Sequence, residues 1–450
     1  MAQDQVALAT RFSVPSGHIG TIKYVGQVNG THGLWYGVEW DDPNRGKHDG
    51  MKDGHRYFNC RVSNAGSFIR PSASLSFGRS FLTALSEKYI ETIHGPATKE
   101  MIMLGSSNGA IKVEAVGLDR IRSNLSTLDR LREVSLDSER VATGDNSDEI
   151  HETCPNIRGL DLSGNLLSTW NAIASLTAGL PHLQRLALNR NRLLPFDIEI
   201  SQSAFQQLVE LQLNKTLITW EEFSRVSQCM TRLKIVELGH NRLESLVADS
   251  SSIIPTIQSF NFDSNQLSDW TQISESMSKC VRLHRLVLSS NNIRTIPPST
   301  SRHSPLEGVT NLGLPGNKLG DWKDIDNLSQ WCPNLESLSI VGNPIAEEND
   351  LACYARQFAV AKIPSLLVLD SAPISQRERT DCELFYLSFI SKNVPGNCQE
   401  KAQHHPQWNA LCNKHGRPEE SLMTNGNDIL KNSLIGETGF APTVEILKNS

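Results

Sequence analysis

The middle of the chain repeats one short pattern of apolar and polar positions. In this pattern, L-x-L-x-x-N-x-L, two alternating apolar residues are followed by an asparagine and one further apolar residue. The first apolar positions of nine successive copies are Val134, Leu160, Leu186, Leu211, Val236, Phe260, Leu286, Leu312 and Leu338. Neighbouring copies are always 24 to 26 residues apart. Because a fixed period of this length is the signature of stacked structural repeats, we expect a solenoid over residues 131–347.

Each repeat is expected to hold a short strand and a returning helix. The alternating apolar residues predict a strand with one face inward, and the asparagine amide can satisfy backbone groups where the chain turns away. A tryptophan follows the asparagine position by four or five residues in four copies, at Trp170, Trp220, Trp270 and Trp322. From each tryptophan the apolar spacing is helical, with one stripe facing the core. We therefore interpret the tryptophans as core packing rather than a ligand cage, in an α/β leucine-rich-repeat solenoid.

Three of the nine cysteines recur at the same phase of the repeat. Cys154, Cys280 and Cys332 each precede an apolar residue by three positions. No C-x-x-C pair and no histidine pair at zinc spacing accompanies them. We expect these thiols to be reduced, small buried core fillers, and we expect no metal site.

The first 75 residues differ in character from the repeats. They are rich in glycine and aromatic residues, with short β-branched runs, as expected of a small barrel-like sheet with tight turns. Residues 8–75 resemble the CAP-Gly family through GTIKYVG, GLWYGVEWDDPNRGKHDG, RYFNC and GSFIRP. The family's G-K-N-D-G loop corresponds here to Gly46, Lys47, His48, Asp49 and Gly50. The complete fold expected is multidomain, with a small β-barrel-like domain before the solenoid.

This resemblance implies capture of an acidic C-terminal tail that ends in Tyr or Phe, as in α-tubulin. Gly46 and Gly50 would then permit unusual backbone dihedral angles and close approach of the peptide, while Lys47 would meet its carboxylates. His48 can donate a hydrogen bond, with a geometry different from that of the family's asparagine. Asp49 either bonds within its own loop or touches the ligand. Three aromatic residues are either tail contacts or barrel core: Trp35, Phe58 and Phe68.

A CAP-Gly domain followed by leucine-rich repeats resembles the tubulin-folding cofactor E family. The resemblance implies a cytoplasmic, cytoskeleton-associated, non-enzymatic chaperone that needs no cofactor and acts with other tubulin-folding cofactors. Its partner would be α-tubulin, in assembly and dissociation of the αβ heterodimer. A tail clamp joined to a second binding surface raises affinity through effective concentration. Outward strand positions are the candidate second contacts: Arg185, Glu210, Glu237 and Arg285.

The segments around the repeats are assigned from weaker patterns. Residues 76–130 are expected to be a linker and N-terminal cap, with a helical stretch from Ser80 and a strand-like IKVEAVGL. Residues 348–395 are expected to be a C-terminal cap, with a strand from Leu366 to Leu369 and a helix that begins near Arg377. Residues 396–450 are expected to be a tail in place of the family's ubiquitin-like module, because 30 residues after Glu420 are too few to fold unaided.

Composition and missing motifs exclude several other classes. The net charge of the whole chain is −6. Residues 1–79 contain nine Lys or Arg and six Asp or Glu, so this segment has a net charge of +3, and the remaining residues have a net charge of −9. A mildly basic small domain favours an acidic peptide over nucleic acid. No apolar run is long enough to cross a membrane, and a monomer is expected.

Two rival functions remain open at this point. A microtubule-end-binding CAP-Gly adaptor is the first alternative, although long heptads and basic Ser/Pro-rich flanks are missing. An enzyme is the second, although the sequence has no Walker A loop, dinucleotide fingerprint or G-x-S-x-G motif. His404, His405 and Cys412 lie close in sequence, but their spacing fits no standard metal site, and we expect them in a solvated tail.

Overall fold

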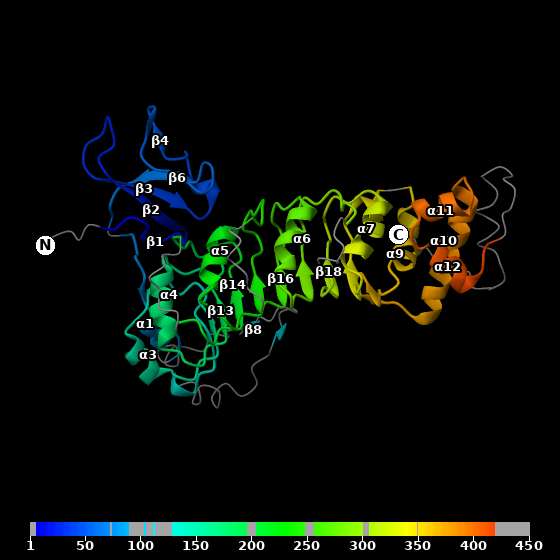
Figure 1. Cartoon of the computed structure of the whole chain (residues 1–450). Helices are drawn as coiled ribbons and strands as arrows, with labels where there is room; N and C mark the ends of the chain where they lie inside the picture. The colour runs from blue at the N-terminus through cyan, green and yellow to red at the C-terminus, as the bar shows by residue number, and fades with distance from the viewer. Residues whose placement is uncertain are drawn as a thin grey trace, which may run out of the picture. The chain divides into compact units, whose positions relative to one another are not determined.

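The computed structural model describes residues 6–72, 74–89, 103–104, 111–112, 128–195, 204–247, 256–299, 306–348 and 350–418. The chain divides into two compact units. The first unit contains residues 1–353 and 365–373, and the second contains residues 354–364 and 374–450. The first unit holds both the glycine-rich N-terminal domain and the repeats (Figure 1).

The N-terminal domain is a small antiparallel sheet with its core on one face. Its strand order is β1-β2-β3-β6. The elements are β1 (Arg11–Ser13), β2 (Ile19–Gly26), β3 (Trp35–Trp40), the 3-10 turn η1 (Pro43–Arg45), the hairpin of β4 (Met51–Lys52) and β5 (His55–Arg56), and β6 (Gly66–Ile69). Phe12, Ile22, Tyr36, Val38 and Trp40 form the buried core.

The repeats share one parallel sheet, as predicted. Its strands are β10 (Glu133–Ser135), β12 (Gly159–Asp161), β13 (Arg185–Ala187), β14 (Glu210–Gln212), β15 (Ile235–Glu237), β16 (Ser259–Asn261), β17 (Arg285–Val287), β18 (Asn311–Gly313), β19 (Ser337–Ser339) and β20 (Val368–Leu369), with β21 (Ala372–Pro373) antiparallel at the end. Each three-residue strand pairs in register with the next, and its central apolar residue is buried. The first and third residues point to the other face, which we call the concave face.

Helices cover the opposite face of this sheet. They are α3 (Ser147–Thr153), α4 (Trp170–Ala178), α5 (Trp220–Ser227), α6 (Trp270–Ser278), α7 (Trp322–Trp331) and the short α8 (Pro344–Glu347). Each tryptophan of the repeat pattern is the first residue of its helix, directly after a capping Thr or Asp. All four rings are buried, which confirms their prediction as core.

The asparagines form a buried ladder that joins neighbouring repeats. The Asn265 amide donates to Leu238 O (3.0 Å) and Phe262 O (2.9 Å), and its oxygen accepts from the amides of Asn241 (2.9 Å) and Leu243 (3.0 Å). In the repeat where threonine replaces asparagine, the Thr216 hydroxyl donates to Leu213 O (2.8 Å). The predicted role of the asparagine in satisfying backbone groups is therefore confirmed.

The stretch expected as a linker contains only two residues between the domains. Ser76 still pairs with Ser13 through two backbone hydrogen bonds (2.8 and 2.9 Å). Arg79 already donates its amide to Arg140 O (3.0 Å), and β7 (Arg79–Ser80) pairs in parallel with β11 (Val141–Thr143) in the first repeat. Phe77 and Gly78 alone lie between these pairings.

The N-terminal cap is described only in part. The predicted helix forms as α1 (Phe81–Tyr89), and the described pieces after it are β8 (Met103–Leu104), β9 (Ile111–Lys112) and the 3-10 turn η3 (Leu128–Arg130). Most of the predicted strand IKVEAVGL lies outside the described residues.

The second unit is helical. It contains α9 (Ala355–Lys362), which follows the 3-10 turn η4 (Ala352–Tyr354), and then α10 (Gln376–Asn393), α11 (Cys398–His404) and α12 (Trp408–His415). The helix predicted near Arg377 is α10, which Ser375 caps. The segment expected as a tail instead forms α11 and α12 up to His415, because Asn397 closes a capping box and Trp408 is buried. Residues 419–450 lie outside the described part.

The three recurring cysteines lie within the described residues. Cys154, Cys280 and Cys332 are buried free thiols, as predicted. Burial raises the pKa of Cys154 to about 12 and that of Cys280 to about 11, so neither is a ready nucleophile. Within the described ranges, no helix has the length and apolar character to cross a bilayer.

Candidate functional site

The sheet of the N-terminal domain carries aromatic side chains on the face away from its core. Tyr24, Gly37 and Phe68 are direct neighbours across β2, β3 and β6. A register shift between Ile22 and Tyr24 turns Tyr24 to this outer face. Because side chains alternate along a strand, Gly37 lies opposite to the buried Tyr36 and Val38. The missing side chain at Gly37 leaves room for the Phe58 ring, which a Cβ atom there would overlap.

The aromatic rings contact one another as a cluster. The Phe68 ring centre lies 5.6 Å from that of Phe58 and 5.3 Å from that of Tyr57, both edge to face. The His48 ring lies 4.9 Å from Phe68, and Tyr24 lies 5.2 Å from Tyr57. Phe58 is buried, while Phe68 is half-buried. We call Tyr24, His48, Tyr57, Phe58 and Phe68 the aromatic platform; its geometry is that of preferred aromatic pairs.

The glycines of the loop are required for different reasons. Gly50 adopts a φ of 97°, in the left-handed region that favours glycine. Gly46, in contrast, has an ordinary extended backbone (φ −69°, ψ 164°), which corrects the expectation of unusual dihedral angles there. A Cβ atom at Gly46 would overlap Asn64 O. Glycine at position 46 therefore serves packing within the domain.

Backbone hydrogen bonds fix the loop against β6. Lys47 and His48 both donate their amides to Gly66 O (2.7 and 3.2 Å), and Gly66 donates to His48 O (2.7 Å). The Lys47 side chain is exposed, and among the described residues it forms no ion pair. A lysine held by its backbone beside an aromatic platform can meet an incoming anion without first giving up another partner.

The His48 side chain is part of the loop structure. Its Nδ1 accepts a hydrogen bond from the Gly50 amide (3.0 Å). Burial lowers the pKa of His48, an effect that Lys47 increases and Asp49 opposes. The neutral ring that results carries its proton on Nε2, because Nδ1 must act as the acceptor. His48 therefore presents a single N–H donor.

Asp49 forms an ion pair with its own hairpin. Arg56 donates to the Asp49 carboxylate (2.8 Å) and also to Asp49 O (3.2 Å). The hydrogen bond from Arg56 lowers the pKa of Asp49. Of the two roles that the sequence left open, this geometry favours the bond within the loop.

Trp35 lies on the platform's side of β3 but has a different neighbour. The Arg70 guanidinium lies 3.9 Å from the Trp35 ring centre, and the indole N–H donates to Thr31 Oγ1 (2.7 Å). The ring is half-buried, so part of its surface is open to a ligand. Sequence reasoning missed Tyr24, Tyr57 and Arg70 as members of this surface, because only tertiary contacts bring their side chains beside the platform and Trp35.

The four concave-face candidates lie on four strands of the sheet: β13, β14, β15 and β17. Arg185 forms an ion pair with Glu133, and Glu210 accepts from the Gln212 amide (2.7 Å). Glu237 accepts from the Asn261 amide (2.7 Å), and burial raises its pKa. Arg285 is exposed. Arg185 and Glu210 are direct neighbours across β13 and β14, whereas Arg285 lies three strands further along.

The described residues offer no metal site. No group of three or more His, Cys, Asp or Glu among them could hold a metal ion. His405, which the sequence placed in a solvated tail, is half-buried and lies 3.0 Å from the Tyr386 hydroxyl within the second unit. Cys412 is buried.

Comparison with known sequences identifies both the domain and the full-length relatives. The CAP-Gly domain model matches residues 5–74. Tubulin-specific chaperone E of Bos taurus is 33% identical over 442 residues, which are 93% of this chain and 82% of the relative. The Homo sapiens protein of the same name is 33% identical with the same coverage, and tubulin-folding cofactor E of Arabidopsis thaliana is 29% identical over 94% of this chain and 81% of its own length.

Solved structures resemble the two parts separately. An internalin (InlF) from Listeria monocytogenes covers 57% of this chain and 72% of its own, with 19% identity and a TM-score of 0.34. The Bik1 CAP-Gly domain, solved with an ETF peptide from Bim1, is 35% identical over 14% of this chain and 75% of its own, with a TM-score of 0.13. The family-model match and the repeated parallel strands of the structure make the fold a CAP-Gly domain followed by a leucine-rich-repeat solenoid, and full-length similarity shows that the chain belongs to the tubulin-specific chaperone E family.

Proposed function

We propose that this protein is a tubulin-folding cofactor that binds α-tubulin through its C-terminal tail at the CAP-Gly platform. The relatives are named tubulin-specific chaperones, which supports a role in tubulin folding and gives no support to an enzyme. The single observation that carries the tail assignment is the exposed Lys47, held beside the aromatic platform with the His48 N–H.

Each part of the site has a chemical counterpart in an acidic tail that ends in an aromatic residue. The terminal ring can pack on Phe68 and Tyr57 in the edge-to-face geometry that these rings already use. Lys47 and the His48 Nε2–H can donate to carboxylate oxygens, and hydrogen bonds to charged groups are the stronger kind. Capture of a terminal carboxylate by such donors is an established way to recognise peptides.

The concave face supplies the proposed second contact with the folded subunit. Arg185, Glu210, Glu237 and Arg285 are the candidate contacts. Two weak contacts on one partner bind more tightly than either alone when both can be made at once. We propose that this two-point grip acts in assembly and dissociation of the αβ heterodimer in the cytoplasm, together with other tubulin-folding cofactors, and that the protein is a monomer.

The test mixes the purified protein with native αβ-tubulin, either intact or with the tails removed by protease, and follows complex size and subunit content by gel filtration. We expect retention of α-tubulin that weakens at least tenfold after tail removal. Retention that does not depend on the tail would contradict the tail assignment. Binding only to polymerised microtubules, with the heterodimer intact, would instead support a microtubule-end adaptor.

A further inference from the structure

The CAP-Gly domain contacts the solenoid through charged groups, of which Arg11 is fully buried and the others are partly buried. Arg11 on β1 is fully buried and binds the Asp41 carboxylate with both terminal nitrogens (3.0 and 2.7 Å). It also donates to Thr21 Oγ1 (3.1 Å) and, across the domain boundary, to Asn165 O of the second repeat (3.4 Å). A guanidinium does not lose its proton in proteins, so its burial requires an anion beside it.

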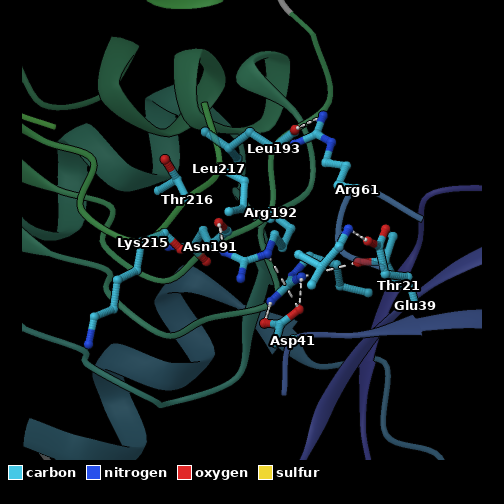
Figure 2. A network of polar contacts seen from close by, with 12 residues as sticks. Thr21, Glu39, Asp41, Arg61, Asn191, Arg192, Leu193, Lys215, Thr216 and Leu217 are labelled. Atoms are coloured by element: carbon cyan, nitrogen blue, oxygen red, sulfur yellow. Dashed lines mark hydrogen bonds and ion pairs between the residues drawn. The ribbon is translucent and has the colours of Figure 1, made fainter. Parts of the chain in front are cut away.

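Asp41 is shared with an arginine of the solenoid. Arg192 Nε lies 3.9 Å from Asp41 Oδ1, and Figure 2 shows the carboxylate facing this guanidinium. Burial lowers the pKa of Arg192, while Asp41 opposes that shift. Arg192 also donates to Lys215 O and to Asn191 O (3.4 Å) within its own repeats. Asp41 therefore lies between two cations, the fully buried Arg11 of the CAP-Gly domain and the partly buried Arg192 of the solenoid.

A second link lies at the edge of the same interface. Arg61 of the CAP-Gly domain donates to Leu193 O (3.0 Å), as Figure 2 shows. Arg61 also lies 3.8 Å from Glu222, near the start of α5. Residues of both domains line a small hollow at this boundary, among them Glu39 and Arg61 on one side and Arg192 and Leu193 on the other.

The chain segment that connects the CAP-Gly domain to the first repeat is short. Ser76 is still bonded to the CAP-Gly domain, and Arg79 is already bonded to the first repeat. Phe77, between them, packs against the CAP-Gly core. A connection of two residues cannot behave as a flexible tether.

We propose that the CAP-Gly domain and the solenoid form one rigid receptor, in which Asp41, Arg192 and Arg61 are positioning residues for capture of a folded acidic-tailed partner. This inference rests on the proposed function. The interface leaves the aromatic platform free and fixes its distance and orientation relative to the concave face. A fixed geometry removes the entropy cost of aligning two sites, so it favours a partner whose tail and body match the fixed spacing.

The experiment compares Asp41→Asn and Arg192→Gln in the full chain with the neighbouring control Asp42→Asn. Asp42 caps the η1 turn through Asn44 and lies outside this network, and asparagine keeps that acceptor. Arg192 belongs to the solenoid, so its replacement leaves every platform residue in place. Three quantities are measured for each protein: affinity for an acidic peptide that ends in Tyr, affinity for intact αβ-tubulin, and tumbling of the CAP-Gly domain by NMR relaxation.

We expect Asp41→Asn and Arg192→Gln to leave peptide affinity within twofold of wild type and to weaken tubulin capture at least tenfold. The CAP-Gly domain should tumble faster than the rest of the chain in both variants, and Asp42→Asn should match wild type. Independent tumbling of the domain in the wild-type protein, or unchanged tubulin capture by both variants, would overturn the rigid receptor. Failure of the wild-type protein to bind the peptide would instead overturn the proposed function. The tumbling measurement would still decide whether the two domains form one rigid unit.

Discussion

Single residues in the CAP-Gly loop differ in what they do for structure and for binding. Gly46 and Gly50 shape the loop, and Asp49 is held by Arg56. Within this loop, Lys47 is the residue whose charged group is exposed and forms no ion pair with any described residue. A loop in which the other members have structural partners can lose the Lys47 ammonium without losing its conformation.

Lys47→Ala should therefore weaken binding of an acidic C-terminal peptide by about 1–3 kcal/mol, as for a lost hydrogen bond to a charged group. Isothermal titration calorimetry measures the change. Lys234→Ala, at an exposed solenoid position, serves as the control and should bind as wild type does. Equal affinities for wild type and Lys47→Ala would count against this site.

His48 gives the loop a dependence on pH. Its pKa in the folded protein lies below the ordinary 6.5, so the hydrogen bond from Gly50 is intact above pH 6.5 and is lost as the pH falls through the folded pKa. Protonation places a hydrogen on Nδ1, which can then no longer accept. We expect protection of the Gly50 amide against hydrogen exchange, corrected for the intrinsic rate, to fall about fivefold for one lost bond.

The matched variant for this prediction is His48→Asn. Asparagine can still accept from the Gly50 amide but does not titrate. Its Gly50 amide should show constant protection between pH 7 and pH 5, and a wild-type protein without any transition below pH 6.5 would refute the assigned tautomer.

At the scale of elements, the repeat is held by polar groups as well as by its apolar core. The Asn265 side chain forms four buried hydrogen bonds with backbone groups of two repeats, and a fifth, partly buried one with Asp263 O (3.4 Å). An alanine there leaves these groups without partners, and each buried unsatisfied group costs about 1–3 kcal/mol before relaxation. Asn265→Ala should lower the unfolding free energy by about 2–4 kcal/mol in chemical denaturation.

Asn292→Ala is the control at this scale. Asn292 is half-buried and accepts from Lys318 (2.6 Å) outside the ladder. We expect Asn292→Ala to change the unfolding free energy by no more than about 0.5 kcal/mol, which is typical of a surface substitution. Equal losses of unfolding free energy for the two substitutions would contradict a specific stabilising role of the asparagine ladder.

At the scale of the whole molecule, the two units contain different titratable groups and can unfold separately. Burial lowers the pKa of His405 in the second unit to about 4, and the cations Lys362 and His404 add to this effect. Because this value lies below the ordinary 6.5, stability is complete above pH 6.5 and is lost as the pH falls towards 4.

Thermal unfolding followed by calorimetry should therefore show the second unit losing on the order of 1 kcal/mol between pH 7 and pH 5, after allowance for partial exposure. His405→Asn should remove this loss, and His404→Asn, at the exposed neighbouring position, should retain it. A pH dependence that survives in His405→Asn would assign the effect to another group.

The sequence by itself determined the features that depend on neighbours along the chain. The 24–26-residue period, the strand and asparagine of each repeat, the helices that begin at the four tryptophans and the CAP-Gly loop were all predicted, because periodic burial and capping are local properties. The wrong expectations fell where the local signal was weak: the backbone angles of Gly46, and the tail that instead forms α11 and α12.

Only the tertiary structure decided which distant side chains meet. The register across β2, β3 and β6 brings Tyr24, Gly37 and Phe68 to one face, and burial at the domain boundary brings Arg11 to Asn165 and Arg192 to Asp41. These pairs are separated by up to 154 residues, and no spacing rule connects them. Their physical basis is desolvation: a buried guanidinium needs an anion wherever the fold supplies one, and that place is fixed only when the domains pack.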